Sequence, residues 1–561
     1  MIRTRPFSRT AVAWAAASML GVGLLSPVAA QALSTGSAPA AAAAAAARPS
    51  SLVVRTDAGK VRGDSRTGYD EWLGIRYAAD PSGADRWKAP QPVVDWSGVR
   101  NATSFGNRCA QNTGWDPGYD KTITSEDCLA LNVYVPHDAK ANAPVVVWIH
   151  GGGSTGGAGQ DTDPQKFVQQ TGAVVVTINY RLGALGFLNL PQLQAESGDG
   201  PGNYGLLDQQ AALRWVHTNI AQFGGDAKNV TIAGQSAGGS AVCDELASPT
   251  AKGLFAHAVI VSGGCSLVSE ATARTQGAAF VKTVGCDTAS DVPACLRAKP
   301  AAALLAAQKT SGVSPSVGGA AFPLNPGTAV QTGKINRVPV LLGQTNSERG
   351  LFTFQNYDYL GTPMTAAQYE QQVRSTYGTD AGKVLAEYPL GAYKSPDDAW
   401  TAVQNGSTSY TRQQLFTSLS KWVPSYAYEF AESDTPHFAS VYLLQQKSQT
   451  ARDFSFGGAV HVDDLGYIWE YLGQTLPYDD DQLELSHQMI SYWGQFAASG
   501  NPNGPRTPNW PTYDPKSGAL MSLKACDSDP ATNQAPAACS KVSTGFAAEH
   551  DLAFWASLPT T

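Results

Sequence analysis

The sequence predicts an α/β protein in which helices flank a central, mostly parallel β-sheet and helical insertions form a cap. Residues 144–150 and 173–179 are near-continuous apolar runs, as expected for strands that are covered on both faces. An amphipathic helix at 203–216 precedes a β-branched run at 229–233, and a further strand is expected at 255–262. Strands that alternate with helices in this way indicate a parallel sheet with right-handed crossovers.

The start of the chain is expected to lie outside this fold. Residues 1–32 contain three arginines, then an apolar stretch at 11–25, then small residues that end at Ala32, which is the three-part pattern of a secretory signal peptide. The apolar stretch is too short to span a bilayer, and Pro27 ends it. We therefore expect signal-peptide cleavage and secretion to the extracellular space, by the general route because no two of these arginines are adjacent.

The rest of the chain divides into a leader and one large domain. Residues 33–50 are rich in alanine and proline and predict a disordered leader, whereas residues 51–561 contain no internal repeat. The formal charge is −7, and removal of residues 1–32 deletes three arginines and no acidic residue, which gives −7 − 3 = −10. This charge argues against nucleic acid or an anionic membrane surface as a partner. No later stretch has the apolar length for stable membrane insertion, and the oligomeric state stays open.

Eight cysteines in a chain that is expected to be exported predict disulfide bonds. No two of them are spaced as C-x-x-C, which argues against a zinc site. Eight cysteines allow about a hundred pairings, and we expect the four sequential ones because each closes a short loop. Cys243 lies on a predicted helix, so a free buried thiol is the alternative there. The expected pairs are Cys109 with Cys128, Cys243 with Cys265, Cys286 with Cys295, and Cys526 with Cys539.

The remaining elements are predicted from the same periodicities. Residues 51–111 combine short apolar runs with turn residues and indicate β-structure. Residues 270–308 and 364–433 lack strand-like runs and predict helical cap segments over the edge of the sheet. Two further sheet strands are expected at 338–343 and 438–444.

Two copies of Gly-x-Ser-x-Gly occur, centred on Ser154 and Ser236. The copy at 234–238 follows a short strand and opens a helix, which is the setting of a nucleophile elbow, a strained turn that needs glycine on both sides of the serine. The copy at 152–156 leads into a loop instead. We therefore favour Ser236 as the nucleophile, and an ordinary strand-to-helix turn is the alternative interpretation.

A glycine triplet, Gly151–Gly153, follows the apolar run at 144–150 and His150. Glycines in this position let backbone N–H groups point into a cavity with no side chain in the way, as an oxyanion hole requires. A flexible surface turn is the alternative interpretation of the triplet.

These segments resemble the type-B carboxylesterases, the family of carboxylesterases, lipases and cholinesterases. Residues 223–238 match that family's nucleophile motif residue for residue. Residues 126–136 resemble its second motif, with Ala130 where an aromatic or hydroxyl residue is usual, and residues 179–188 are also similar. The resemblance implies an α/β-hydrolase fold and a catalytic domain over residues 51–561, which hydrolyses carboxylic esters with a serine nucleophile and without metal or cofactor.

A serine hydroxyl needs a base, and the base needs a carboxylate that fixes its tautomer. In this fold the acid and then the histidine follow the serine. We expect His461 as the base because residues 457–464 resemble the family's histidine loop, with Val462 where glycine is usual. The other histidines after Ser236 are expected inside a strand, just before a strand or in helix-like stretches: His257, His437, His487 and His550.

The acid is expected to be Glu348, which follows a predicted strand and matches the glutamate of the family's triad. Arg349 stands where that family often has glycine, and a surface glutamate beside an arginine in a turn is the alternative interpretation. Asp463 and Asp464 are too close to His461 in sequence to reach its Nδ1 easily.

The resemblance implies a mechanism for these residues. Ser236 attacks the ester carbonyl with His461 as base, and the N–H groups of Gly152, Gly153 and Ala237 stabilise the oxyanion. Water then cleaves the acyl-enzyme.

Several substrate classes stay open, all of them small-molecule or lipid esters. A lipase is the first alternative, because the cap segments could line a long apolar channel. A cholinesterase-like enzyme is less favoured: Trp115 lies in a Trp-Asp-Pro-Gly motif farther from Cys128 than the choline-binding pattern requires, and Gln235 replaces the glutamate that cholinesterases carry before the serine. A non-catalytic binding module is disfavoured because serine, glutamate and histidine are all present.

Overall fold

The computed structural model describes residues 49, 51–112, 124–197, 202–437, 457–505, 507–526 and 539–558. The expected signal peptide, nearly all of the leader, Trp115 and the strand expected at 438–444 lie outside these residues. All of the described residues belong to one compact unit, Ala45–Thr561.

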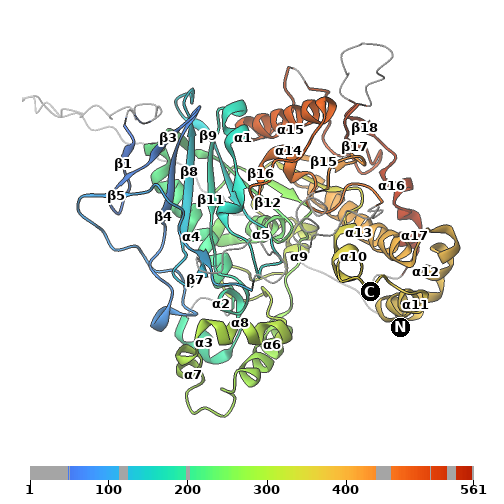
Figure 1. Cartoon of the computed structure of the whole chain (residues 1–561), viewed down its shortest axis with the longest axis horizontal. Coiled ribbons are helices and arrows are strands. Elements are labelled where there is room, and N and C mark those ends of the chain that lie inside the picture. Colours follow the sequence, from blue (N-terminus) through green and yellow to red (C-terminus); the bar gives the residue numbers. More distant parts are fainter. Residues whose placement is uncertain are drawn as a thin grey trace, which may run out of the picture. The chain divides into compact units, whose positions relative to one another are not determined.

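The main sheet of the described residues has 11 strands in the order β18-β17-β15-β14-β13-β12-β9-β11-β8-β4-β3. Neighbours from β11 to β17 are parallel, and the strands at both ends are antiparallel to their neighbours. Figure 1 shows these strands side by side. Their bounds are β3 Asp64–Arg66, β4 Tyr69–Arg76, β8 Ala130–Pro136, β9 Ala143–Ile149, β11 Val174–Ile178, β12 Gly225–Gln235, β13 His257–Val261, β14 Val340–Thr345, β15 Ser425–Phe430, β17 Leu520–Leu523 and β18 Lys541–Ser543.

Apolar side chains on both faces of the central strands build two separate cores. In β9, Val145, Val147 and Ile149 belong to one hydrophobic cluster, and Val146 and Trp148 belong to the other. This alternation follows from the two-residue period of a strand, so a continuous apolar run supplies both faces at once. The sequence-based prediction of a doubly covered, mostly parallel sheet is confirmed.

Helices cover each core. The first contains side chains of α4 (Tyr204–Asn219), α5 (Ala237–Ala247) and α13 (Pro396–Ser420). The second contains side chains of α1 (Gln165–Thr171) and α15 (Asp480–Ser499). The sheet therefore lies between two helical layers, which is the arrangement of an α/β-hydrolase fold.

The cap segment predicted at 270–308 is helical, with α6 Glu270–Thr283, α7 Val292–Ala298 and α8 Ala301–Ser311. These helices lie together at the lower end of the view in Figure 1. The other described α-helices are α2 Gly183–Phe187, α3 Pro191–Ser197, α9 Pro326–Thr332, α10 Gly350–Asn356, α11 Ala366–Tyr377, α12 Ala381–Glu387, α14 Leu465–Ile468, α16 Phe546–Glu549 and α17 Leu552–Ser557.

The prediction of no strand between 364 and 433 is wrong, because β15 occupies Ser425–Phe430 and lies inside the sheet between β14 and β17. Its sequence is Ser-Tyr-Ala-Tyr-Glu-Phe, in which Tyr426, Tyr428 and Phe430 face one core while Ala427 faces the other. Because tyrosine and glutamate interrupt the apolar residues, this strand does not form a continuous apolar run. Its two-residue period is the signal that could have found it.

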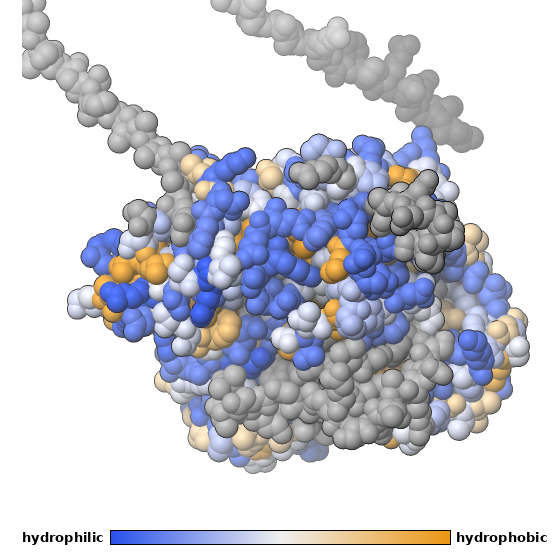
Figure 2. All heavy atoms as spheres, turned by 45° about the horizontal axis from the view of Figure 1, so that its top comes forward, coloured by the Kyte–Doolittle hydropathy of each residue, from blue (hydrophilic) through white to orange (hydrophobic). Residues whose placement is uncertain are grey.

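Smaller β-structures surround the sheet. They are the three-stranded group β1 (Val53–Arg55), β2 (Lys60–Arg62) and β5 (Val99–Asn101), and the pairs β6 (Arg108–Cys109) with β7 (Thr124–Ser125) and β10 (Thr162–Asp163) with β16 (Glu470–Tyr471). On the face shown in Figure 2, hydrophilic side chains predominate and hydrophobic ones are scattered. No helix within the described ranges is long and apolar enough to cross a membrane.

Four disulfide bonds join the eight cysteines in sequential order, and no cysteine is free. Cys243 of α5 is bonded to Cys265, which follows β13. This bond therefore ties the helix after Ser236 to the segment after the neighbouring strand. The other three bonds close loops at Cys109–Cys128, Cys286–Cys295 and Cys526–Cys539.

Candidate active site

The strand register brings several loops to one edge of the sheet. Ile149 at the end of β9 pairs with Gly234, and Gln235 at the end of β12 pairs with Val261 of β13. Val261 in turn pairs with Gly343 of β14. Because parallel strands share the edge at which they end, the segments that follow all four strands meet there, as ligand sites in such sheets do.

Ser236 is the single residue that connects β12 to α5, and its backbone angles are φ 58° and ψ −124°. Such a conformation costs about 1–3 kcal/mol for a residue other than glycine. Its N–H donates to the carbonyl of Val261 at 2.9 Å. A Cβ at Gly234 would lie 2.5 Å from the carbonyl carbon of Gly238, and a Cβ at Gly238 would lie 2.0 Å from the carbonyl oxygen of Ile149. Both flanking glycines are therefore required by close backbone contacts.

Glu348 and His461 lie in contact in the described structure. Nδ1 of His461 donates a short hydrogen bond to Oε1 of Glu348. The second carboxylate oxygen accepts bonds from Oγ of Ser262 and Oγ1 of Thr345, each at 2.9 Å, and from the Thr345 N–H at 3.2 Å. Both Glu348 and His461 are buried. Side chains at the ends of β13 and β14 and in the loop before α14 thus hold the carboxylate in one orientation.

The electrostatic surroundings keep Glu348 ionised. Burial by itself raises the pKa of this carboxyl, but the charge and hydrogen bond of His461, the charge of Arg412 and the hydrogen bond of Thr345 lower it to about 2. At neutral pH, Glu348 is therefore an ionised carboxylate that accepts a hydrogen bond from the protonated Nδ1 of His461.

Hydrogen bonds also connect this pair to the serine turn. Nε2 of Gln235 donates to the carbonyl of His461 at 3.3 Å, and Ser262, which bonds Glu348, directly follows the carbonyl that accepts the Ser236 N–H. Nε2 of His461 is buried and has no hydrogen-bond partner within the described structure, Ser236 included. The imidazole thus keeps an open nitrogen on the side opposite Glu348.

The glycine triplet packs against the serine turn. A Cβ at Gly151 would lie 3.1 Å from Cβ of Ser236. Gly152 and Gly153 have φ values of 102° and 61°, which favour glycine. Within the described ranges, the N–H groups of Gly152, Gly153 and Ala237 donate to no protein acceptor. Unused N–H groups beside the candidate nucleophile Ser236 are what an oxyanion hole would require.

His150, which precedes the triplet, is fixed from both sides. Its ring stacks on Tyr180 with a centroid separation of 4.3 Å, and the Tyr180 hydroxyl donates to the His150 carbonyl at 2.7 Å. Burial lowers the pKa of His150 to about 4, so the neutral ring donates from Nδ1 to the carbonyl of Gly151 at 2.8 Å. These contacts set the start of the glycine loop.

The alternative residues from the sequence lie in other settings. Ser154 is followed by turns and a short 3-10 helix at Gly159–Asp161, not by an α-helix.

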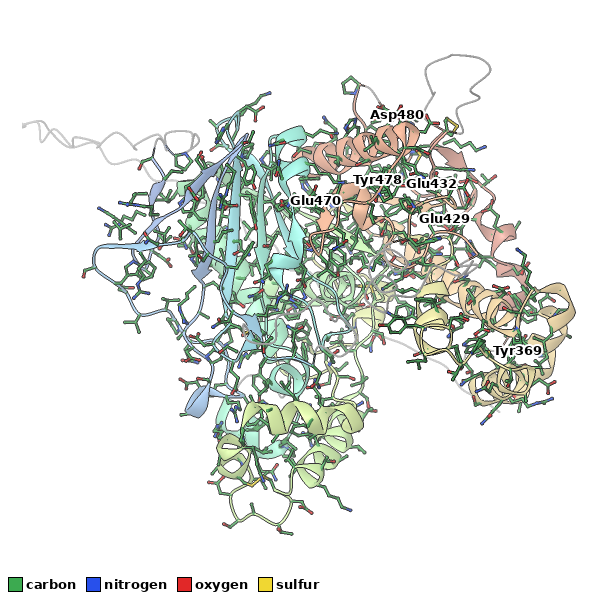
Figure 3. All side chains as sticks on the ribbon, viewed as in Figure 1. Tyr369, Glu429, Glu432, Glu470, Tyr478 and Asp480 are labelled. Carbon is green, nitrogen blue, oxygen red and sulfur yellow. A yellow bond between two sulfur atoms is a disulfide. The ribbon has the colours of Figure 1, made fainter. Side chains whose placement is uncertain are left out.

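The other histidines and acidic residues considered for the triad have partners elsewhere. His437 forms a hydrogen bond with Asp463 at 2.7 Å, and Asp464 accepts a hydrogen bond from Tyr428. His257 lies in β13, and His487 is 3.8 Å from Glu484. His550 bonds Glu429 of β15 at 2.5 Å, and Figure 3 labels Glu429.

Sequence reasoning missed four residues at this site: Ser262, Thr345, Phe352 and Arg412. Ser262 and Thr345 lie at the ends of β13 and β14, so polar residues at strand ends were the available signal. Phe352 lies with its ring centroid 4.8 Å from that of His461, and Arg412 is buried in α13. Neither could be placed without tertiary contacts.

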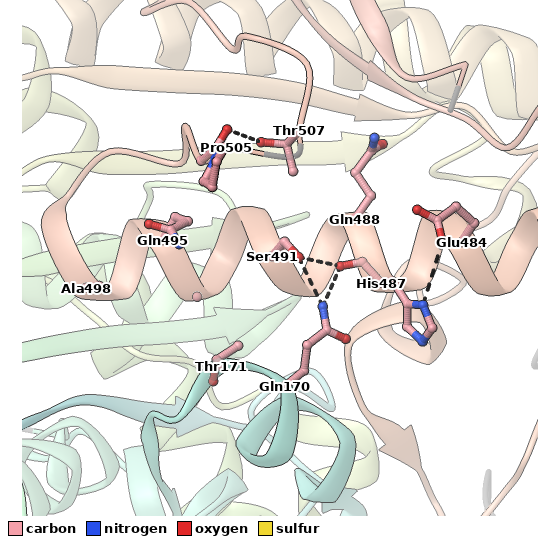
Figure 4. Close-up of a pocket in the computed structure, with 12 residues that line it drawn as sticks. Gln170, Thr171, Glu484, His487, Gln488, Ser491, Gln495, Ala498, Pro505 and Thr507 are labelled. Carbon is pink, nitrogen blue, oxygen red and sulfur yellow. Dashed lines mark hydrogen bonds and ion pairs between the residues drawn. The ribbon is translucent and has the colours of Figure 1, made fainter. Parts of the chain in front are cut away.

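A pocket of about 580 Å³ lies away from these residues. It is a polar groove between α1 and α15, shown in Figure 4, where Gln170 donates to the carbonyl of His487 and to the hydroxyl of Ser491. None of the predicted site residues lines it. Within the described part of the chain, no group of three or more His, Cys, Asp or Glu side chains is arranged to hold a metal ion.

Comparisons with known proteins identify the family of this chain. The model of the carboxylesterase family matches residues 50–540. Para-nitrobenzyl esterase of Bacillus subtilis is 34% identical over 82% of this chain and 92% of its own. Pyrethroid hydrolase Ces2a of Mus musculus is 32% identical over 83% of this chain and 86% of its own. Acetylcholinesterase of Bungarus fasciatus is 31% identical over 83% of this chain and 82% of its own.

Solved esterase structures share the fold of this chain. A thermophilic PNB esterase has a TM-score of 0.71 and 30% identity, covering 84% of this chain and 96% of that one. A second PNB esterase structure has a TM-score of 0.73 and 28% identity, covering 91% and 100%. The family match over most of the chain and the shared fold show that this protein belongs to the carboxylesterase family and is a carboxylic-ester hydrolase.

Proposed function

We propose that this protein is a secreted serine carboxylesterase that acts through Ser236, His461 and Glu348 and an acyl-enzyme intermediate. One observation carries the proposal: ionised Glu348 fixes Nδ1 of His461, while the opposite nitrogen is buried and has no partner in the described structure. Gln235, which directly precedes Ser236, bonds the His461 carbonyl and so links the histidine to the strained serine turn. This is the state that a general base needs before it accepts a proton from a serine hydroxyl.

In the first step, Nε2 of His461 removes the proton of the Ser236 hydroxyl while Oγ attacks the ester carbonyl. The resulting imidazolium lies against the carboxylate of Glu348, which stabilises its positive charge and keeps the ring in place. The same proton then passes from Nε2 to the leaving alcohol, which departs and leaves Ser236 acylated.

The tetrahedral intermediate places a negative charge on the former carbonyl oxygen. The N–H groups of Gly152, Gly153 and Ala237 have no protein acceptor in the described structure, so they can donate to this oxygen without breaking existing bonds. Loss of one such donor typically costs about 10²- to 10³-fold in kcat. Water cleaves the acyl-enzyme by the same steps in reverse, with His461 again as base.

Export follows from the start of the chain. We assign residues 1–32 to a cleaved signal peptide, residues 33–50 to a leader and residues 51–561 to the catalytic domain. Four disulfide bonds are compatible with an oxidising compartment outside the cytoplasm.

The substrates are proposed to be small-molecule or lipid esters without a cationic alcohol group, with a broad preference for chain length. Gln235 is a buried neutral amide directly before the nucleophile, so it supplies no charge that would attract a choline group. A choline ester is therefore expected to be a poor substrate, although an acetylcholinesterase is among the relatives.

A panel of p-nitrophenyl esters from acetyl to palmitoyl, together with a choline thioester, tests this function on the secreted enzyme. We expect hydrolysis of the short and medium esters, and a loss of several orders of magnitude in the Ser236→Ala variant. Ser154→Ala is the matched control and should retain activity. Activity that survives Ser236→Ala and is lost in Ser154→Ala would contradict the proposal.

A further inference from the structure

Arg349 is a half-buried cation close to the catalytic imidazole. Its guanidinium carbon lies 4.4 Å from the ring centroid of Phe352, and that ring lies 4.8 Å from the ring of His461. The two distances place the guanidinium within about 9 Å of the imidazole. Arg349 caps α10 and Phe352 lies three residues later, so both side chains project from one face of this helix.

The guanidinium of Arg349 has no acceptor within the described structure. Its backbone N–H donates to Oδ1 of Asn405 at 2.8 Å, but no hydrogen bond or ion pair reaches its side chain. The neighbouring carboxylate of Glu348 is already engaged by His461, Ser262 and Thr345. Within the described ranges, its five N–H donors are therefore left without a protein partner.

Two other shielded arginines have carboxylate partners, whereas buried Arg412 has no ion pair in the described structure. Arg181 is buried and bonded to Asp208 at 2.7 Å, and Arg86 is buried and paired with Glu126. Because a guanidinium binds a carboxylate through two parallel hydrogen bonds, and because shielding from water strengthens that attraction, Arg349 is suited to accept an anion from outside the protein.

We propose that Arg349 is a specificity-determining residue that binds a carboxylate group of the substrate, so that the enzyme favours esters carrying an anion a few bonds from the ester carbonyl. This inference rests on the proposed function of the same site. Phe352 supports the guanidinium on its ring and also contacts the imidazole ring, so one aromatic side chain positions both groups.

Two matched pairs of esters distinguish where the anion lies. On the acyl side, mono-p-nitrophenyl adipate is compared with p-nitrophenyl hexanoate, which has the same number of acyl carbons and no charge. The two carbonyl carbons of adipate lie about 6 Å apart when the chain is extended, which is comparable with the separation of at most about 9 Å between the guanidinium and the imidazole. On the alcohol side, 4-acetoxybenzoate is compared with 4-acetoxybenzamide, its neutral isostere.

The readout is the ratio of kcat/KM for the anionic ester to that for its neutral partner. We expect Arg349→Gln to lower this ratio about ten-fold in at least one pair, because one charge-assisted contact is lost. Arg349→Lys should keep part of the preference for the anionic ester, because lysine retains the positive charge but cannot form two parallel hydrogen bonds to a carboxylate. Added salt should lower the ratio of the unaltered enzyme toward that of Arg349→Gln.

Arg374 provides the matched control, because it is an exposed arginine of α11 that pairs with Glu370 at 3.7 Å. Arg374→Gln removes the same charge and should leave the ratio unchanged. An unchanged ratio in Arg349→Gln for both pairs would overturn the inference, and so would equal losses for anionic and neutral esters. By contrast, hexanoate hydrolysis that persists in Ser236→Ala would refute the proposed function itself.

Discussion

At the scale of single residues, Glu348 has every polar contact that an orienting carboxylate needs. One oxygen receives His461 and the other receives Ser262 and Thr345. We expect Glu348→Gln to lower kcat by about 10³- to 10⁴-fold with little change in KM, because the amide favours the wrong tautomer of the histidine. Steady-state kinetics with a p-nitrophenyl ester measure this.

Glu429→Gln is the control for that substitution, because it alters a second buried histidine–carboxylate pair, with His550, away from the serine turn. Its kcat should stay near that of the unaltered enzyme while it is folded. A similar kcat for Glu348→Gln and Glu429→Gln would contradict the assigned role of Glu348.

The lowered pKa of Glu348 has a consequence for stability. The folded value of about 2 lies below the value of about 4.3 for an unfolded chain. The ionised carboxylate therefore contributes stability that is present above about pH 4.3 and is lost as the pH falls toward 2, up to a limit of about 3 kcal/mol.

Urea unfolding of the native enzyme and of Glu348→Gln at several pH values checks this sign. The difference in the free energy of unfolding between the two proteins should shrink as the pH is lowered from about 6 to about 3. A difference that stays constant or grows over this range would show that Glu348 is not ionised at low pH in the folded protein.

At the scale of elements, the β12–α5 turn depends on the close approach of the β9 backbone. Gly238→Ala would bring a Cβ to 2.0 Å from the Ile149 carbonyl oxygen and 2.8 Å from that of His150. Neither backbone atom can move away without displacing the glycine loop. We expect this variant to lose both esterase activity and thermal stability, measured by kinetics and by the unfolding midpoint.

Gly382→Ala is the matched control, because Gly382 lies in α12 and an added Cβ would meet no atom within 4 Å. Alanine is favoured over glycine in a helix by about 1 kcal/mol, so this variant should be as stable as the native enzyme or more so, and fully active. If both variants behaved alike, the packing account of the turn would be wrong.

The sequence predicts those elements whose pattern lies within a short stretch of neighbouring residues. The apolar runs of β9 and β11 and the glycines around Ser236 are visible in the chain itself. Strand β15 was missed because its tyrosines and glutamate resemble a helical cap segment by composition. The partners of Glu348 could not be predicted, because Ser262 and Thr345 come from strand ends that only the sheet order brings together.

At the scale of the whole molecule, four disulfide bonds join the eight cysteines of a chain for which we propose an export signal. We expect peptide mapping of the secreted enzyme under non-reducing conditions to give these four sequential pairs and no free thiol. The mature N-terminus should lie after the signal segment. Cross-pairing among the eight cysteines, or a free thiol at Cys109 or Cys128, would refute the pairing.

The central claim is that Ser236 is the nucleophile of this carboxylesterase. Covalent labelling of the secreted enzyme with a fluorophosphonate, followed by peptide mass spectrometry, tests it most directly, because the reagent modifies the serine that an adjacent base activates. We predict a single adduct on Ser236, concurrent with loss of esterase activity, and no adduct in the His461→Ala variant. An adduct on Ser154, or complete inactivation with Ser236 unmodified, would contradict the account.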